Sequence, residues 1–440
     1  MLWNKDTKTI SYYLEKKLRD GIQTNFGGCF LLIPYLQQLQ IEEKVKTLGI
    51  EKKTGIPPVN DFLMWVNLAV VGKERACRVM ELRDEGIAIA SGLPIKPHQS
   101  QLHQFLKEPK LGRVQRFIIE IGKRQYEIGQ IDGGIVSWDS HLLTYEGEID
   151  LQQDKDSKSA FPVKAIKVHA VHDQKYRNPI YLTVEYPGKR PIEIGQHLMS
   201  ATKEIIPDKE IIHTMDKWFS VGELLEHIRQ GGQKFVTLIK RHKNRVEEMG
   251  RIPLEKFRRL TTQMGITSIK TSLRNYSQDV RLVVIEDIID GARVLYGYLT
   301  NDEKTEEEKV IEIYSGRWGI EFWFDEGKFL GIDKLPGIGL NEVALHLATK
   351  LVAYDAISAF RANTGGEYIS HNLATIYEEF FNVQALVKLR GDRIQVTIYG
   401  HPREDKIESL YHNLNEKLKN KGIDPRVPWL NNYFLKFQFK

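Results

Sequence analysis

Four residues between positions 314 and 328 have types and spacing suited to phosphate chemistry. Tyr314, Arg317, Glu321 and Lys328 follow the pattern Y-x2-R-x3-E-x6-K. In one continuous α-helix, at about 100° per residue, all four fall within an arc of about 60°. Such a face is suited to holding a phosphate backbone beside a metal-ligating carboxylate. The plainer alternative is an ordinary ion pair between Arg317 and Glu321 on an exposed helix.

The residues before this pattern predict a helix. The segment Thr305–Glu308 has the form of a capping box, and its three acids suit the positive end of a helix. No proline follows until Pro336, although three glycines lower the helix propensity. We therefore expect one helix that begins near Thr305 and carries Glu321.

Two aspartates stand at the ends of predicted strands. The first strand, 131–139, follows a break in the pattern and ends on Asp139, and a later strand, 211–216, ends on Asp216. Alternating residues over 163–172 and 180–186 predict antiparallel strands between these two. A helix capped by Ser220-Val-Gly-Glu223 and a strand over 235–239 follow. This order predicts a mixed α/β layer in which the strands of the two aspartates lie side by side.

Asp139, Asp216 and Glu321 thus form a candidate carboxylate constellation. Three like charges in one place repel each other, so the cluster needs a compensating cation. Oxygen ligands without Cys or His favour Mg²⁺ or Mn²⁺. Two such ions about 3.5–4 Å apart activate a water or a 3′-hydroxyl in phosphodiester displacement. For either aspartate taken alone, a turn or capping role is the alternative.

Length and pattern predict several domains, because 440 residues exceed one compact core. We expect a helical region over 1–130, an α/β domain over 131–350 with a β-rich insertion at about 240–300, and a helical tail over 351–440. For residues 1–130, charge and position suggest DNA binding, and a plain helical scaffold is the alternative. The helical region has amphipathic stretches near 34–48, 59–71, 73–84 and 111–128, and the tail has one strand pair near 385–398.

The charge distribution favours nucleic acid as a partner. The net charge is +5, and residues 1–130 hold 20 Lys and Arg against 14 Asp and Glu. Residues 234–259 hold nine Lys and Arg against three Glu. Two basic regions flanking a phosphate-handling site suggest DNA, whereas a solvated surface is the alternative for each region alone.

Composition excludes other classes. Two cysteines give no disulfide framework or cysteine-rich zinc site, and the 13 histidines show no metal-ligand spacing, so we expect them to be ordinary polar residues. The N-terminus lacks a signal-peptide pattern, and the longest apolar stretch, 62–71, is too short to span a bilayer. A cytoplasmic protein without membrane contact is expected.

The order and spacing of these residues resemble the DDE transposases of bacterial insertion sequences, whose core is ribonuclease-H-like. The resemblance is to the group marked by a Y-R-E-K signature and a β-rich insertion between the second aspartate and the glutamate. It covers roughly 130–345, with a weaker likeness over 20–105. Leu299-Thr-Asn-Asp302 is also similar to the family's strand that leads into the signature helix.

The resemblance implies a role for each candidate residue. The metal ligands would be Asp139, Asp216 and Glu321, the phosphate contacts near the transposon end would be Tyr314, Arg317 and Lys328, and Trp318 would contact a terminal nucleotide. It implies a transposase that binds terminal inverted repeats, cleaves double-stranded DNA at the element ends and joins the 3′-hydroxyls to a target in cut-and-paste transposition. The metal would be Mg²⁺ or Mn²⁺, as two ions.

Pairing two ends on one target requires two active sites, so we expect a homodimer on DNA with contacts from the tail and the region before 130. Two other functions remain open. One is a ribonuclease-H-like nuclease without strand transfer, and the other is a catalytically silent DNA-end-binding regulator.

Overall fold

The computed structural model describes residues 5–155 and 161–440. The chain forms two compact units. We name residues 129–142 and 146–323 the central unit, and residues 1–128, 143–145 and 324–440 the flanking unit. The flanking unit therefore joins the two end regions that the sequence analysis placed in separate domains.

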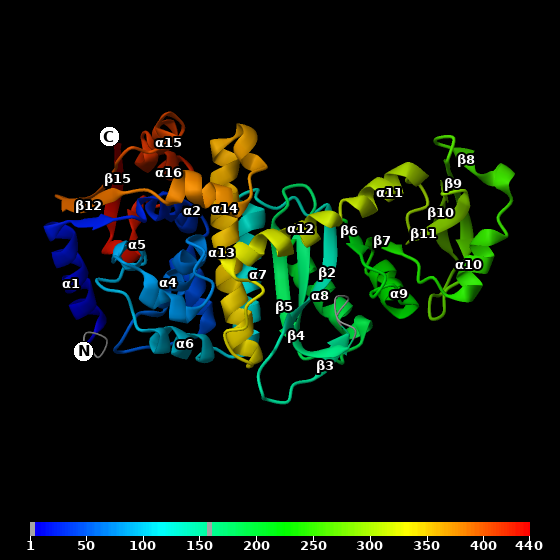
Figure 1. Ribbon diagram of the computed structural model, residues 1–440, viewed down its shortest axis with the longest axis horizontal. Helices are drawn as coiled ribbons and strands as arrows, with labels where there is room; N and C mark the ends of the chain where they lie inside the picture. The colour runs from blue at the N-terminus through cyan, green and yellow to red at the C-terminus, as the bar shows by residue number, and fades with distance from the viewer. Residues whose placement is uncertain (1–4, 156–160) are drawn as a thin grey trace. The chain divides into compact units, whose positions relative to one another are not determined.

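The described part of the central unit contains a ten-stranded mixed sheet (Figure 1). The strand order is β3-β4-β2-β6-β7-β11-β10-β9-β8, and β5 pairs with β4. Its strands are β2 (Ile135–Thr144), β3 (Gln153–Lys155), β4 (Pro162–Asp173), β5 (Pro179–Glu185), β6 (Ile212–Met215), β7 (Lys234–Leu238), β8 (Arg258–Arg259), β9 (Met264–Thr271), β10 (Val280–Ile289) and β11 (Ala292–Thr300).

The centre of this sheet is parallel. β2 pairs with β6, and β6 pairs with β7, both in parallel register. Parallel strands buried on both faces have nearly continuous apolar runs, and β6 fits this rule because three of its four residues are buried. The predicted placement of the two aspartate strands side by side is confirmed.

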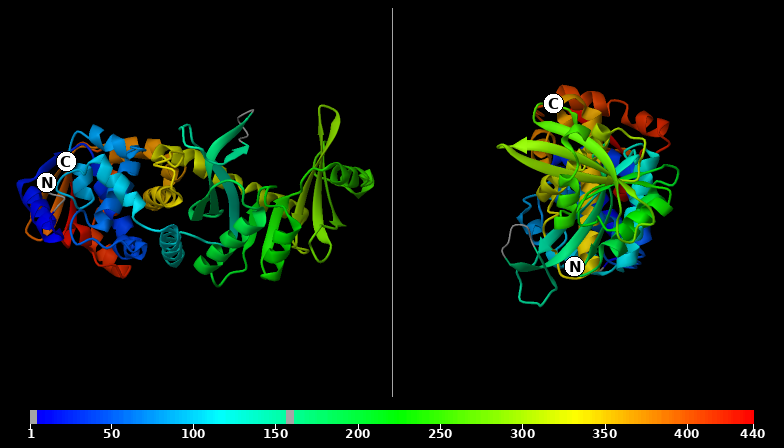
Figure 2. Two further views of the ribbon diagram at one scale, coloured as in Figure 1. Left: turned by 90° about the horizontal axis from the view of Figure 1, so that it is seen from below. Right: turned by 90° about the vertical axis from the view of Figure 1, so that its right-hand side faces the viewer.

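The predicted insertion at 240–300 extends the same sheet. β11 returns to pair with β7 in antiparallel register, and β10 and β9 continue outward as hairpins. The turn between β10 and β11 is a two-residue turn of Asp290 and Gly291, both with positive φ, as a tight hairpin requires. Figure 2 shows these yellow-green strands with the green helix α10 (Lys243–Gly250), which packs on β11.

The remaining helices of the central unit are α8 (Pro191–Ile205), α9 (Gly222–Gln230), α11 (Glu307–Ser315) and the first part of α12 (Trp318–Glu326). The predicted helix over 220–229 is thus present. Its predicted Ser220 cap is wrong, because α9 has Val221 at the N-cap position without a side-chain bond.

The predicted capping box at Thr305 is also wrong. Glu306 is the N-cap residue of α11 and makes no side-chain capping bond. The turn is instead held by Asp302, whose carboxylate accepts hydrogen bonds from the backbone N–H groups of Lys304 and Thr305 and from the Thr305 hydroxyl. The helix start is therefore fixed from the end of the preceding strand.

The flanking unit is mostly helical. Its helices are α1 (Thr7–Asp20), α2 (Ile33–Gln38), α3 (Ile41–Val45), α4 (Pro58–Val70), α5 (Gly86–Ala90), α6 (Gln99–Lys107), α7 (Leu111–Glu127), α13 (Leu340–Thr364), α14 (Leu373–Ile376), α15 (Glu404–Tyr411) and α16 (Leu414–Asn420). The predicted helix over 73–84 is only a short 3-10 segment, Ala76–Glu81.

Helix α13 forms the core of this unit and packs on α4 and α7 (Figure 1). By length and apolar composition α13 is a candidate membrane span, but 94% of its most apolar window is buried inside the protein. A core helix passes the same test, so this feature is weak evidence for a membrane segment.

The tail contains more strands than predicted. The expected pair is present as β12 (Ala385–Arg390) and β13 (Arg393–Ile398). These two join β1 (Ile22–Thr24), β14 (Arg426–Val427) and β15 (Tyr433–Phe439) in a five-stranded sheet. β15 pairs in parallel with β13, so the last described strand lies beside a strand near the middle of the tail. The α/β fold class with helical regions at both ends is confirmed.

Candidate active site

The two aspartates follow the last paired residues of β2 and β6. Trp138 is paired with Met215 in the parallel register; Asp139 is the next residue of β2, and Asp216 is the first residue after β6. The prediction that Asp139 ends its strand is wrong, because β2 continues to Thr144. Pairing with β6 nevertheless stops before Asp139. The two carboxylates therefore come from equivalent positions, directly after the last residue pair of the two parallel strands.

The predicted single helix is broken between Tyr314 and Trp318. α11 ends at Ser315, and α12 begins at Trp318. The connecting backbone bonds are of the 3-10 type: the Arg317 N–H donates to the Tyr314 carbonyl at 3.0 Å, and the Ile320 N–H donates to the Arg317 carbonyl at 3.0 Å. The four signature residues therefore do not share one continuous helical face.

A glutamine side chain occupies the space beside this break. A Cβ on Gly316 would lie 2.2 Å from Gln174 Oε1, which is too close for any other residue without a shift. The Gln174 amide nitrogen lies 3.0 Å from Ser137 Oγ, 2.9 Å from Thr214 Oγ1 and 3.1 Å from the Ile313 carbonyl oxygen. Gln174 thus ties α11 to β2 and β6 immediately before the two aspartates.

Arg317 links two of the three acids. Its Nη1 lies 3.0 Å from Asp139 Oδ2, and its Nη2 lies 2.6 Å from Glu321 Oε1. The guanidinium is buried, with 7% of the residue exposed, and packs 5.5 Å from the Tyr314 ring centroid. The Arg317–Glu321 ion pair expected as the plainer alternative is therefore present, and Asp139 adds a second carboxylate to it.

The environment of Asp139 disfavours its charge. Burial raises the pKa of its carboxyl to about 6, and the nearby charges of Glu321 and Asp216 also raise it. Arg317 and the Ser140 backbone N–H, which donates to Asp139 Oδ1 at 2.8 Å, act in the opposite direction. Asp139 is thus close enough to each of the other two predicted acids to feel its charge.

Lys240 is a charged neighbour that the sequence analysis did not single out. It lies two residues after β7, the strand that pairs with β6. Burial lowers the pKa of its ammonium, and the negative charge of Asp216 opposes this effect. The only sequence signal was its place in the basic segment 234–259, which does not indicate a carboxylate partner.

The other signature residues lie in different environments. Tyr314 is 6% exposed, and its hydroxyl has no hydrogen-bond partner among the residues that the structure describes. Trp318 is 64% exposed, 6.0 Å from the Arg317 guanidinium. Lys328 lies in a 3-10 turn of the flanking unit, Gly327–Leu330, and pairs with Asp325 at 2.5 Å.

The donor set fits a hard divalent cation. Asp139, Asp216 and Glu321 offer the carboxylate oxygens that Mg²⁺ and Mn²⁺ prefer, and two of them already converge on one positive group. Within the described ranges, however, no three acidic, histidine or cysteine side chains are arranged closely enough to hold a metal ion. Arg317 is the positive group that currently bridges the carboxylates.

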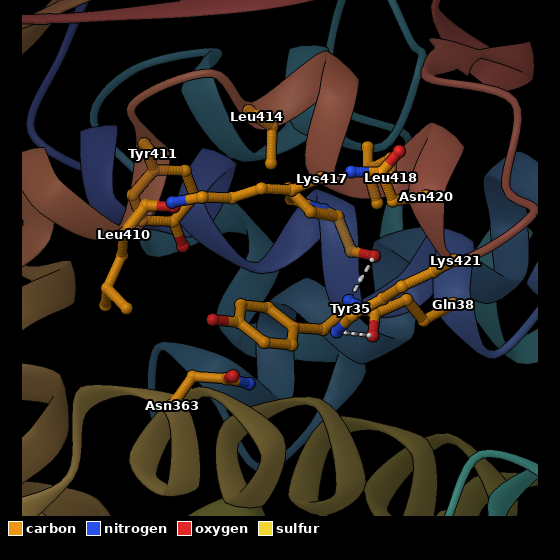
Figure 3. Close-up of a pocket in the computed structure, with 11 residues that line it drawn as sticks. Tyr35, Gln38, Asn363, Leu410, Tyr411, Leu414, Lys417, Leu418, Asn420 and Lys421 are labelled. Atoms are coloured by element: carbon orange, nitrogen blue, oxygen red, sulfur yellow. Dashed lines mark hydrogen bonds between the residues drawn. The ribbon is translucent and has the colours of Figure 1, made fainter.

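A pocket in the flanking unit has a different character. Figure 3 shows this cavity of about 370 Å³, which Tyr35 and Tyr411 help to line. The Lys421 ammonium lies 3.1 Å from Gln38 Oε1. Its lining residues include no carboxylate. The pocket therefore does not offer an alternative metal site.

Comparisons with known proteins place most of the central unit in a known family. The family model described as "Transposase DDE domain" matches residues 125–355, more than half of the chain. A comparison with curated proteins finds no significant match.

Two solved structures show a distant likeness. A piggyBac transposase synaptic complex with hairpin DNA is 12% identical, with 90% of this chain and 80% of that chain covered and a TM-score of 0.44. A Mos1 transposase paired-end complex with the left transposon end is 16% identical, with 42% and 61% covered and a TM-score of 0.18.

Proposed function

Because the chain belongs to the DDE transposase domain family, we propose that it binds the terminal inverted repeats of a mobile element, cleaves the DNA at these ends and joins the 3′-hydroxyls to target DNA. One observation carries this proposal. Asp139 and Asp216 follow paired residues of adjacent parallel strands, and Glu321 converges with Asp139 on Arg317. This arrangement collects three acids that are more than 70 residues apart in the sequence.

Asp139, Asp216 and Glu321 would hold Mg²⁺ or Mn²⁺, and we propose two ions. When bound, such ions activate a water or 3′-hydroxyl and stabilise the leaving oxygen of a phosphodiester displacement. The raised pKa of Asp139 fits this role, because a buried carboxylate of this kind gains from a nearby cation.

The protein's own groups would orient the DNA. Arg317 has more donors than its two carboxylates use, and its Nε has no hydrogen-bond partner among the described residues. We propose that Arg317, Tyr314 and Lys328 contact phosphates near the element end. Trp318, whose ring is mostly exposed, would stack on a terminal nucleotide. With these roles, we propose that the chain is a member of the group with the Y-R-E-K signature that is found in bacterial insertion sequences.

The proposal is tested by incubating the purified full-length protein with labelled DNA from the regions that flank its gene, with Mg²⁺, with Mn²⁺ and with EDTA. We expect cleavage at the element ends and joined products in the presence of either metal. Glu321→Gln should bind the DNA and fail to cut it. The matched control is Glu312→Gln on α11, an exposed acid that pairs only with Lys309 in the described contacts and should leave cleavage unchanged within about twofold.

The products separate the proposal from its alternatives. Cleaved ends without joined products would indicate a nuclease that lacks strand transfer. Metal-independent binding without any cleavage by the wild-type protein would indicate a DNA-end-binding regulator. Cutting by Glu321→Gln at the wild-type rate would contradict the assignment of the acids.

A further inference from the structure

His169 on β4 contacts a neighbour of each catalytic aspartate. Its Nδ1 lies 2.7 Å from the hydroxyl of Ser140, the residue after Asp139. Its ring stacks on Trp218, two residues after Asp216, with the ring centroids 5.6 Å apart and the planes 19° apart. His169 is completely buried, so both contacts are shielded from water.

A glutamate fixes the orientation of this imidazole. His169 Nε2 lies 2.9 Å from Glu185 Oε1 on β5, and Glu185 is also buried. Burial lowers the pKa of His169, with Glu185 opposing this effect, so the ring is neutral at neutral pH. A neutral ring that donates its Nε2–H to Glu185 leaves Nδ1 as an acceptor for the Ser140 hydroxyl. The three residues thus form a directed chain of hydrogen bonds.

Ser140 and Trp218, which His169 contacts, each donate a backbone hydrogen bond to one of the aspartates. The Ser140 N–H lies 2.8 Å from Asp139 Oδ1, and the Trp218 N–H lies 3.4 Å from Asp216 Oδ2. Side chains alternate across a strand, so the Ser140 side chain is on the face of β2 opposite to Asp139. The His169 side chain therefore contacts Ser140 on the face of the sheet opposite to the Asp139 carboxylate, and it does not reach the reacting atoms.

The position of these contacts explains why they matter. The ladder between β2 and β6 ends at Trp138 and Met215, so the aspartates are the first residues that it no longer holds. Trp218 is supported on its ring by Lys167, whose Nζ lies 4.4 Å from the ring centroid. Beyond the last β2–β6 residue pair, His169 connects the two segments that carry the aspartates through its contacts with Ser140 and Trp218.

Resting on the function proposed above, we propose that His169 is a positioning residue that sets the separation of Asp139 and Asp216 by holding Ser140 and Trp218 at once. It thereby determines how well the two carboxylates bind a divalent cation. Groups that orient metal ligands in this way typically contribute about 10- to 100-fold to metal affinity.

The test measures Mn²⁺ binding to the full-length protein without DNA, from the electron paramagnetic resonance signal of free Mn²⁺, together with the melting temperature. His169→Phe keeps an aromatic ring against Trp218 and removes both hydrogen bonds. Ser140→Ala removes only the hydroxyl. We expect both variants to weaken Mn²⁺ binding about tenfold or more. His169→Asn, which keeps an acceptor near the Nδ1 position, should recover part of the affinity lost in His169→Phe.

The matched control is His346→Phe in the flanking unit. His346 is equally buried, packs edge-on against Trp65 and lies 3.1 Å from the Gly331 carbonyl oxygen through Nε2. Its replacement should lower the melting temperature as His169→Phe does and leave the Mn²⁺ affinity within about twofold of wild type. A merely structural role for His169 predicts the same affinity for both variants.

Two results would overturn the inference in distinguishable ways. If Asp139→Asn abolishes Mn²⁺ binding while His169→Phe binds as wild type, the positioning role is wrong and the proposed function stands. If wild type and Asp139→Asn bind Mn²⁺ equally and neither cuts the element-end DNA, the proposed metal site fails, and the positioning role fails with it.

Discussion

The Nη1 atom of Arg317 lies 3.0 Å from Oδ2 of Asp139, which joins the turn between α11 and α12 to strand β2. The same guanidinium binds Glu321, so two of the three proposed metal ligands share one internal cation. A buried charge is costly without a partner, and here each of the three groups depends on the others. The acids and the arginine therefore form one electrostatic unit.

Replacing Arg317 should show, in the free energy of unfolding, that the three charged groups depend on one another. We expect Arg317→Ala to lower the free energy of unfolding by about 1–3 kcal/mol, since it leaves the half-buried carboxylates of Asp139 and Glu321 without their cation. Adding Asp139→Asn should recover part of this loss, with a coupling of about 0.5–3 kcal/mol in a denaturant double-mutant cycle. Arg19→Ala, at an exposed pair with Glu15, is the control and should leave the stability unchanged. If the effects of Arg317→Ala and Asp139→Asn on the free energy of unfolding were additive, the two residues would not be electrostatically coupled.

Asp139 should make stability depend on pH in an unusual direction. Its pKa is raised to about 6 in the folded protein, against about 3.9 when unfolded. The folded state binds more protons between these values, so this group's contribution to stability falls as pH rises from about 4 to 6. Asp139→Asn should be about 1–3 kcal/mol more stable than wild type at pH 7.5, with the difference fading below pH 4. A constant difference in urea unfolding across this range would refute the raised pKa.

The proposed phosphate contact of Lys328 predicts a change in salt dependence. Losing one phosphate contact releases one fewer counterion, so Lys328→Ala should flatten the slope of log K against log[salt] by about one unit. Lys309→Ala removes an exposed lysine on α11 that pairs with Glu312, and it should leave the slope unchanged. Fluorescence anisotropy with end DNA measures both. Equal slopes for wild type and Lys328→Ala would remove this lysine from the interface.

The break between α11 and α12 should require glycine at position 316. In Gly316→Ala the new methyl group meets the Gln174 amide, and overpacking of this kind costs about 1–3 kcal/mol. Gly112→Ala in α7 is the matched control, because a Cβ there meets nothing within 4 Å and alanine favours a helix. Calorimetry should show a lower melting temperature for Gly316→Ala alone. Equal melting temperatures would mean that Gln174 yields without cost.

Joining two element ends predicts a two-fold assembly on DNA. We expect mass photometry of the protein with end DNA to give complexes of two chains and two ends, since isologous dimers are the commonest closed arrangement. Glu321→Gln should assemble equally, because its defect is chemical. Complexes of a single chain with a single end that never pair, at any concentration that supports strand transfer, would exclude the dimer.

Much of the central unit could be predicted from the sequence because its signals are local. Alternation marked the antiparallel strands β4 and β5, and the order of elements along the chain predicted that the strands of Asp139 and Asp216 are neighbours. The family match covers this same region. Asp139, Asp216 and Glu321 could be singled out as candidates because acids that follow apolar strand segments or stand in a helical pattern are visible in the sequence itself.

The contacts made by distant residues could not be predicted. Gln174, which lies beside the helix break, is 139 residues from its bonding partner Ile313. The bridging role of Arg317 depends on the same turn. His169 showed no metal-ligand spacing, and only the pairing of β4 beside β2 brings it to Ser140. The strands β1 and β15 were missed because they are stabilised by partners elsewhere in the flanking unit.

The tip of the β10–β11 hairpin is a suitable place to attach a spectroscopic probe. Its Asp290–Gly291 tip is a tight turn, and a Cβ at Gly291 would meet nothing within 4 Å. The hairpin is hydrogen-bonded through β7 to β6, the strand that precedes Asp216. Once the exposed Cys77 is replaced, a probe on Asp290→Cys is attached rigidly to the sheet that carries Asp216, whereas the other thiol, Cys29, is buried. Distances between two such probes would follow the pairing of element ends in real time.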